Sequence, residues 1–335
     1  MFVDDLLVTG LELHDQAIWT PAVTRRCPEW LSGLCASSCG PNCRAGAAWH
    51  IVPPVTIGSL ISIVAPPVSP EDNEGDWGDV EDSLGTDLPN DFKDLVRAYG
   101  SGSFCGISVW SPFNGRFDGE FSLLVRAESF LDDFAIFREK NPEEFEYPIF
   151  PEEDGLLEWA SAANGAKICW LTQGSPNAWP VVVWDYGYGS SPFRLSAVEF
   201  LELYLTGNLD EEQVPSRPVC PWFDQMRNLV EVTVTLSPSG LARRERLRAI
   251  VEACGPVVDR GDFEWDGGER QNNLALSGGE WFLTYITSGE RHWVKISFPE
   301  GNSDRVEALV RQAVRGMGCD IVEALDDEGE LMWER

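Results

Sequence analysis

The side chains that most often perform catalysis are scarce in this sequence. Histidine occurs only as His14, His50 and His292, and a Ser/His/Asp or Cys/His arrangement would have to use one of them. None stands in a recognisable nucleophile setting, and no G-x-S-x-G segment is present. We interpret His292 as a surface or edge-strand histidine and expect no enzymatic activity of this kind.

Two groups of potential metal ligands lack the required spacing. The first is spaced C-x7-C-x3-C-x3-C, without the paired C-x2-C knuckles of zinc sites, and consists of Cys27, Cys35, Cys39, Cys43 and the later His50. Asp262, Glu264 and Asp266 imitate the first half of a calcium loop, but Asn273 stands where a bidentate glutamate is needed. We therefore predict no metal and no cofactor, and a hairpin turn at residues 266–268.

Two other segments resemble ligand-binding motifs only superficially. The glycine-rich run 100–106 follows an expected helix and precedes a strand, which is the reverse of what phosphate binding at a helix N-terminus requires. We predict a turn there. A small basic cluster, which we interpret as a solvated helix face that balances nearby acids, consists of Arg243, Arg244, Arg246 and Arg248.

Negative charge is the dominant feature of the composition. The 335 residues include 55 acidic and 25 basic side chains, a net charge of -30, of which residues 67–217 contribute -20. This excess repels nucleic acid and anionic membranes and favours a basic protein partner. Since 43% of the residues are hydrophobic and 14 are tryptophan, the chain can bury a sizeable core.

Two acidic clusters in the middle of the chain are the predicted partner-binding residues. The first consists of Glu71, Asp72, Glu74, Asp76, Asp79, Glu81 and Asp82. The second consists of Glu143, Glu144, Glu146, Glu152, Glu153 and Asp154. The alternative is that both are acidic loops that only keep the protein soluble.

Composition divides the chain into four parts. Residues 1–70 are rich in cysteine and proline without a sustained period, so we expect a low-order extension, or residues 1–67 that are not natively translated. Residues 71–212 form a first domain, 213–221 a proline-rich linker and 222–335 a second domain. Four prolines in the apolar run 51–68 argue against a membrane helix, and the acidic start lacks a secretory signal, so we expect a cytoplasmic location.

Both domains are predicted to be α+β. In the first, we expect helices at 77–84, 88–99, 129–140 and 196–206, and strands at 104–110, 156–159, 167–172 and 180–184. In the second, we expect strands at 230–236, 273–276, 280–287, 292–298 and 321–325, and helices at 241–254 and 303–316. The resulting β-α-β-β-β-α-β order of the second domain predicts a ferredoxin-like sandwich.

The first domain contains a set of mainly aromatic, glycine and proline residues whose order and spacing resemble those of a known protein family. The members of the set are Trp77, Gly85, Leu88, Pro89, Tyr99, Gly100, Gly102, Phe104, Pro112, Trp159, Asn164, Trp170, Pro180 and Trp184. Over about residues 72–210 this pattern resembles the SUKH superfamily, which includes yeast Smi/Knr-type cell-wall regulators and bacterial immunity proteins. We interpret these residues as mainly structural, because glycines supply positive φ at turns and tryptophans fill cores.

The resemblance implies one curved sheet flanked by helices and no catalytic activity. Bacterial members of the superfamily bind and neutralise toxin domains, often nucleases. We therefore expect a non-enzymatic protein that neutralises a cationic toxin domain through an acidic surface. The alternatives are a regulatory or scaffold protein, and a carboxylate-dependent hydrolase, which would need a deep pocket with carboxyl groups about 5–10 Å apart.

Overall fold

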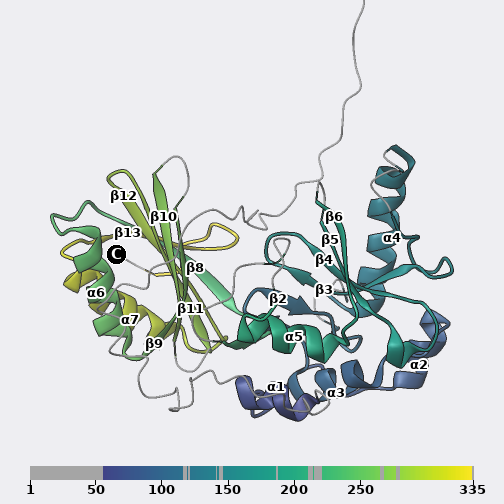
Figure 1. The fold of residues 1–335 in the computed structure, drawn as a ribbon. Coiled ribbons are helices and arrows are strands. Elements are labelled where there is room, and N and C mark those ends of the chain that lie inside the picture. The colour runs from purple at the N-terminus through teal and green to yellow at the C-terminus, as the bar shows by residue number, and fades with distance from the viewer. Residues whose placement is uncertain are drawn as a thin grey trace, which may run out of the picture.

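The computed structural model describes residues 56–333, apart from 116–118, 120, 141, 143–145, 186–187, 210–213, 215–220, 265–267 and 277–279. These residues form helices and two antiparallel sheets, of seven and six strands, which lie in separate domains (Figure 1). The predicted α+β class is confirmed. The cysteine group of residues 27–43 and His50 lie outside the described residues.

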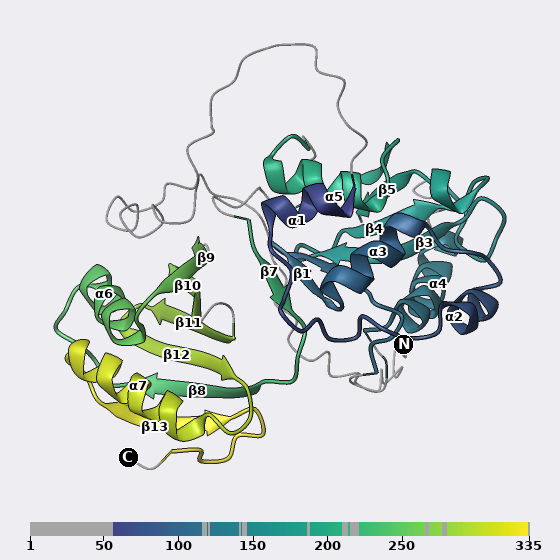
Figure 2. The ribbon, with the colours of Figure 1, turned by 90° about the horizontal axis from the view of Figure 1, so that it is seen from below.

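Helices cover both faces of the first sheet (Figures 1 and 2). Helices α1 (Ile57–Ile63), α3 (Asn90–Tyr99) and α5 (Ala197–Thr206) pack together on one face. Helix α4 (Leu123–Lys140) covers the other face, and α2 (Trp77–Leu84) lies against α4. The sheet runs in the order β6 (Gly189–Phe193), β5 (Val181–Asp185), β4 (Lys167–Leu171), β3 (Leu156–Ala162), β2 (Ile107–Val109), β1 (Gly102–Phe104) and β7 (Phe223–Gln225), with a short 3₁₀ helix, η4 (Pro176–Ala178), between β4 and β5.

Local sequence signals explain the helices that were predicted correctly. Asp76 caps α2 through a hydrogen bond from the Gly78 amide, and Gly85 ends it at φ 72°. Ser196 and Glu199 form a capping box at the start of α5, and Gly207 ends that helix in the left-handed conformation. The apolar positions of α3, three and four residues apart, are all buried: Phe92, Leu95, Val96 and Tyr99.

Two predicted elements of the first domain are wrong in extent. The segment 104–110 is not one strand but the hairpin β1–β2, because Cys105 and Gly106 take positive φ values of 53° and 92°. Helix α4 begins at Leu123, six residues before the predicted Ser129. The hairpin around Asn164–Gly165 is present, and it joins β3 to β4.

The first domain extends beyond the expected boundary at residue 70. Helix α1 lies in the stretch assigned to a low-order extension, yet Leu60 is fully buried in the first core. The Tyr99 hydroxyl donates to the Val64 carbonyl at 2.5 Å. The folded unit therefore includes residues from about 56 onward.

The second domain packs helices α6 (Arg243–Cys254) and α7 (Ser303–Gly316) on one face of a six-stranded sheet (Figure 2). The strand order is β13 (Ile321–Asp326), β8 (Val230–Leu236), β12 (Arg291–Phe298), β11 (Trp281–Ser288), β10 (Glu269–Leu276) and β9 (Val257–Glu264). Strand β9 was not predicted; it forms a hairpin with β10, and residues 266 and 267 of the predicted turn lie outside the described residues. Without this hairpin's two strands the chain order is β-α-β-β-α-β, as in ferredoxin-like domains.

Two residue-level expectations for the second domain are corrected. Strand β12 lies between β8 and β11, and His292 is 1% exposed, so it is neither a surface nor an edge-strand histidine. The arginine cluster of α6 is not wholly solvated either. Arg243 turns inward and donates to Asn272 and Thr287, whereas Arg248 is exposed.

The segment expected to begin the second domain belongs to the first sheet. Strand β7 pairs with β1, and the Phe223 ring lies 5.1 Å from the Tyr99 ring and 4.7 Å from the Phe104 ring. Arg260 of β9 binds Asp224 at 2.6 Å, and its guanidinium lies 4.5 Å from the Trp222 ring centre. The two domains are thus joined by a largely, but not fully, buried ion pair as well as by the chain.

Candidate partner-binding surface

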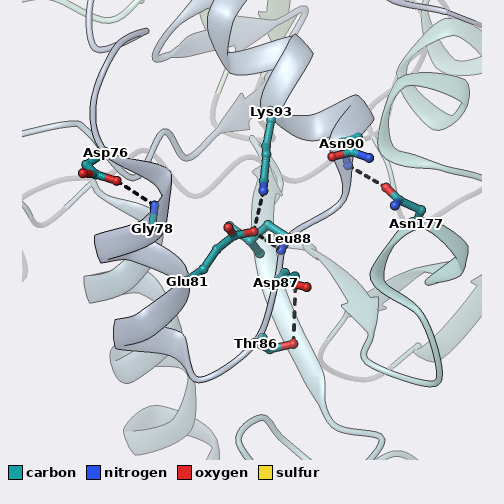
Figure 3. Close-up of polar contacts among 9 residues, drawn as sticks. All are labelled: Asp76, Gly78, Glu81, Thr86, Asp87, Leu88, Asn90, Lys93 and Asn177. Carbon is teal, nitrogen blue, oxygen red and sulfur yellow. Dashed lines mark hydrogen bonds and ion pairs between the residues drawn. The ribbon is translucent and has the colours of Figure 1, made fainter.

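Several acids of the first predicted cluster support the fold instead of facing a partner. Glu81 receives Lys93 Nζ at 2.5 Å and the Leu88 amide at 2.6 Å, which ties α2 to α3 (Figure 3). Burial alone would raise the pKa of Glu81, but the hydrogen bonds and the Lys93 charge together hold it below its ordinary value. Asp76 serves as the helix cap.

Glu71 and Asp72 anchor the chain that enters α2. The Glu71 carbonyl accepts the Ser101 amide at 3.1 Å, and a Cβ on Gly100 would lie 1.8 Å from that carbonyl oxygen. Ser111 Oγ donates to the Asp72 carbonyl at 2.5 Å. Burial raises the pKa of the Asp72 carboxyl, against a hydrogen bond from Ser101. Three acids of the first cluster are exposed and have no such role among the described residues: Glu74, Asp79 and Asp82.

The second predicted cluster is divided in the same way. Glu143 and Glu144 lie outside the described residues. Glu152 accepts both terminal nitrogens of Arg138, and the hydrogen bond from Arg138 holds the pKa of Glu152 below its usual range. Asp154 takes a φ of 58° and accepts Gln173 Nε2 at 3.3 Å. Glu146 and Glu153 are exposed.

Helix α4 adds three acids that sequence reasoning missed. Glu128, Asp132, Ala135 and Glu139 are exposed and recur at helical spacing, so they form one stripe. The Leu123 amide at the start of α4 bonds Ser111, which also holds Asp72, and Arg138 near its end binds Glu152. Helix α4, which carries the stripe, therefore extends from the region of the first predicted cluster to that of the second. The spacing could have been recognised had the helix been predicted to start at residue 123.

We call the exposed acids of α2, α4 and the segment after α4 the acidic belt. None of them forms an ion pair with a lysine or arginine within the described residues. Its members are Glu74, Asp79, Asp82, Glu128, Asp132, Glu139, Glu146 and Glu153.

A groove of about 420 Å³ lies between α4 and the segment that precedes β3. Its apolar lining consists of Leu131, Ala135, Pro142 and Ile149. Arg138, Glu139 and Glu152 complete its lining, and Arg138 is paired with Glu152 there. Because Arg138 keeps the pKa of Glu152 low, this carboxyl is not suited to be the general acid that a hydrolase needs.

The residues that carry the family resemblance lie in the core or at turns. The Phe92 ring contacts Trp77, Trp159 and Trp170 at centroid distances of 6.3, 6.2 and 4.8 Å. Gly85 and Gly100 take positive φ values of 72° and 68°. Buried members of the set are Leu88, Pro89, Tyr99, Gly100, Gly102, Phe104, Trp159, Trp170 and Trp184; Trp77, Pro112, Asn164 and Pro180 are half-buried.

Within the described part of the chain, no three His, Cys, Asp or Glu side chains are grouped so that they could hold a metal ion. No helix built from those residues is both long and apolar enough to cross a lipid bilayer.

The comparison with known families gives one match. Residues 74–201 match the family model SUKH_6, described as SMI1-KNR4 cell-wall. Neither the curated proteins nor the solved structures contain a match. The matched segment runs from the loop before α2 into α5, so α1, β7 and the whole second domain lie outside it. The region from α2 into α5 is thus similar to the SUKH-type domains of the SMI1-KNR4 family, in agreement with the resemblance carried by its residues.

Proposed function

We propose that this protein is a non-enzymatic immunity protein that neutralises a basic, nuclease-type toxin domain in the cytoplasm through the acidic belt. The observation that supports the proposal is the belt itself. Eight exposed carboxylates, free of ion pairs with described residues, lie on a SUKH-type domain, and one of them, Glu139, lines a groove whose other lining is partly apolar. A surface that merely kept the protein soluble would not need a partly apolar groove beside its acids.

The physical mechanism combines steering with anchoring. A negative field attracts a basic partner and can raise its association rate to about 10⁸ M⁻¹s⁻¹ at low salt. A nuclease must carry positive charge to bind phosphates, so the acidic belt can occupy that site competitively. Affinity would come mainly from an apolar or arginine side chain of the toxin seated in the groove against Leu131 and Ile149.

The test uses toxins encoded beside this gene, co-expressed with the full chain. We expect protection, and a complex by size exclusion whose association rate falls as salt rises. The double variant Asp132→Lys/Glu139→Lys should weaken binding at least tenfold. Glu252→Lys/Glu300→Lys makes the same charge change on the second domain and should leave binding nearly unchanged.

Two outcomes would count against the proposal. One is unchanged toxicity together with no complex. The other is an equal loss in both double variants, which would mean that only net charge matters and that the belt is no specific site.

A regulatory or scaffold protein is the second candidate, and the family description as cell-wall protein favours it. This role predicts a gene without a toxin neighbour and partners from the cell's own proteins. A pull-down from native lysate at low and high salt separates the two, because a toxin held by charge is lost as salt rises.

A further inference from the structure

The face of the second sheet that α6 and α7 cover is mainly apolar, but near the start of α6 its residues are polar. Asn272 of β10, Tyr285 and Thr287 of β11, and His292 of β12 are all buried there. Buried polar groups at the end of an apolar core cost free energy unless each finds a partner. We call these four residues, together with Arg243 and Arg246, the polar niche.

Two arginines of α6 close the niche. Arg243 Nη2 donates to Asn272 Oδ1 at 2.5 Å, and its Nε donates to Thr287 Oγ1 at 3.2 Å. The guanidinium carbons of Arg243 and Arg246 each lie 5.9 Å from the Tyr285 ring centre. Residues three apart lie on the same side of a helix, so two positive charges meet at one aromatic ring.

The other members of the niche supply no negative charge. His292 Nε2 lies 2.8 Å from the Ser237 carbonyl, which can only accept, so Nε2 carries the proton and Nδ1 accepts the Tyr285 hydroxyl at 3.3 Å. Burial lowers the pKa of His292, and the Arg246 charge acts in the same direction. Burial raises the pKa of Tyr285 to about 12, so the phenol stays neutral.

Neither arginine has a carboxylate partner among the described residues. Asp262 is exposed on β9 and acts on Arg243 only through its field, and Arg246 Nε is buried without a hydrogen-bond partner in the described part of the chain. Elsewhere in the fold, Arg126 and Arg260 bind Glu158 and Asp224 directly. The two guanidiniums of the niche are thus partly desolvated and uncompensated, which is costly unless an anion joins them.

We propose that the polar niche binds a small phosphate dianion, either free phosphate or the phosphoryl group of a small molecule. Two guanidinium forks match the charge and the oxygens of a phosphate. The niche lies at the first turn of the 12-residue helix α6, where the Glu245 carboxylate accepts the Ala242 amide at 2.9 Å, so the two guanidiniums and not the helix amides would hold the anion. A net charge of -30 opposes long polyanions, which restricts the ligand to a small one. This site does not depend on the toxin-binding role.

The test is isothermal titration of the full-length protein with inorganic phosphate, phenyl phosphate and acetate at constant ionic strength and pH 7.5. We expect the wild type to bind a phosphate more tightly than acetate. Tighter binding of phenyl phosphate would identify an organic phosphate as the source, and tighter binding of inorganic phosphate would identify the free ion.

Arg246→Gln should weaken phosphate binding about tenfold or more, because it removes a charge-assisted donor. Arg248→Gln, on the same helix and exposed, is the matched control and should bind as the wild type. Circular dichroism checks folding, and Arg243→Gln replaces the first variant if that variant is unfolded. The proposal is overturned by no heat with either phosphate, by full binding in the niche variant, or by an equal loss in Arg248→Gln.

Discussion

Glu158 of β3 is a fully buried carboxylate that faces α4. Its Oε1 lies 3.3 Å from Arg126 Nη2, 3.5 Å from Lys167 Nζ and 3.4 Å from Trp110 Nε1. Its Oε2 is buried with no hydrogen-bond partner among the described residues. Arg126 and Lys167, at moderate distances, therefore compensate the desolvated charge of Glu158. The free energy of folding depends on all three groups together.

Glu158→Gln should destabilise the protein by about 2–4 kcal/mol, because it keeps the shape but leaves Arg126 and Lys167 without their counter-charge. Urea denaturation at pH 7 measures the loss. Glu153→Gln, on an exposed acid of the belt, should change the free energy of unfolding by less than about 0.5 kcal/mol. A Glu158→Gln protein as stable as the wild type would show that the buried charge contributes nothing.

Glu81 gives a pH-dependent prediction with a defined sign. Since its folded-state pKa is lowered, its contribution to stability is present above its ordinary pKa of 4.5 and is lost as pH falls through the folded value. Glu81→Gln should therefore cost about 1 kcal/mol at pH 7 and almost nothing once pH is below the folded pKa.

Urea midpoints of the wild type and of Glu81→Gln from pH 7 to pH 2.5 test this, with the exposed Asp79→Asn of the same helix as control. A gap between wild type and Glu81→Gln that stays constant with pH would contradict it. A gap of the same size for Asp79→Asn would mean that the Lys93 contact is unimportant.

Single-residue roles were the hardest to predict from sequence. In a chain with 55 acids, nothing in the local pattern distinguishes Glu81 and Glu152, which bind cations of the fold, from Glu74 and Glu153, which face solvent. Their roles depend on Lys93 and Arg138, which only the folded chain brings close to them. Positions with local causes, such as the Asp76 cap and Gly85, could be predicted.

At the scale of elements, prediction succeeded where caps and periodicity are local. Helices α2 and α5 and strand β8 have bounds close to those expected. The β1–β2 hairpin was missed because Cys105 takes a left-handed conformation that is uncommon outside glycine. Strand β9 was missed because Gly261, at φ 112°, and a bulge interrupt its alternation.

The pairing of β7 with β1 requires a glycine at residue 102. A Cβ there would lie 2.2 Å from Phe223 Cζ and 2.6 Å from the Asp224 carbonyl oxygen. Gly102→Ala should therefore displace β7 and cost about 1–3 kcal/mol. Hydrogen exchange of the Met226 amide, which donates to Ser101, should become faster.

Gly240→Ala is the matched control for this variant, because a Cβ there meets nothing within 4 Å. It should leave both the stability and the exchange rate nearly unchanged. A Gly102→Ala protein with wild-type exchange at Met226 would show that β7 tolerates the side chain.

At the scale of the whole molecule, strand β7 couples the two domains. It lies where the second domain was expected to begin, but it pairs with a strand of the first domain. Residues 222–226 follow the proline-rich stretch but complete the sheet of the SUKH-type domain. Asn273 and Leu274 of β10 pair with Gly261 and Asp259 of β9. Arg260, which lies between these two β9 residues, is therefore the extra residue of a β-bulge. Such a bulge re-aims a side chain, and here Arg260 reaches Asp224 and Trp222 across the domain junction.

This coupling predicts that the two domains unfold together. Burial raises the pKa of Asp224 although Arg260 acts to lower it, so removing the arginine leaves a carboxylate that is costly to keep ionised. Arg260→Met should cost about 3–5 kcal/mol at pH 7 and split one calorimetric transition into two. The loss should shrink as pH falls, because protonation of Asp224 removes its charge, and the double variant Arg260→Met/Asp224→Asn should recover much of it. Arg270→Met removes an exposed pair with Glu264 and should cost under about 1 kcal/mol with one transition retained. Two independent transitions in the wild type, or no recovery in the double variant, would show that the domains are joined by the chain alone.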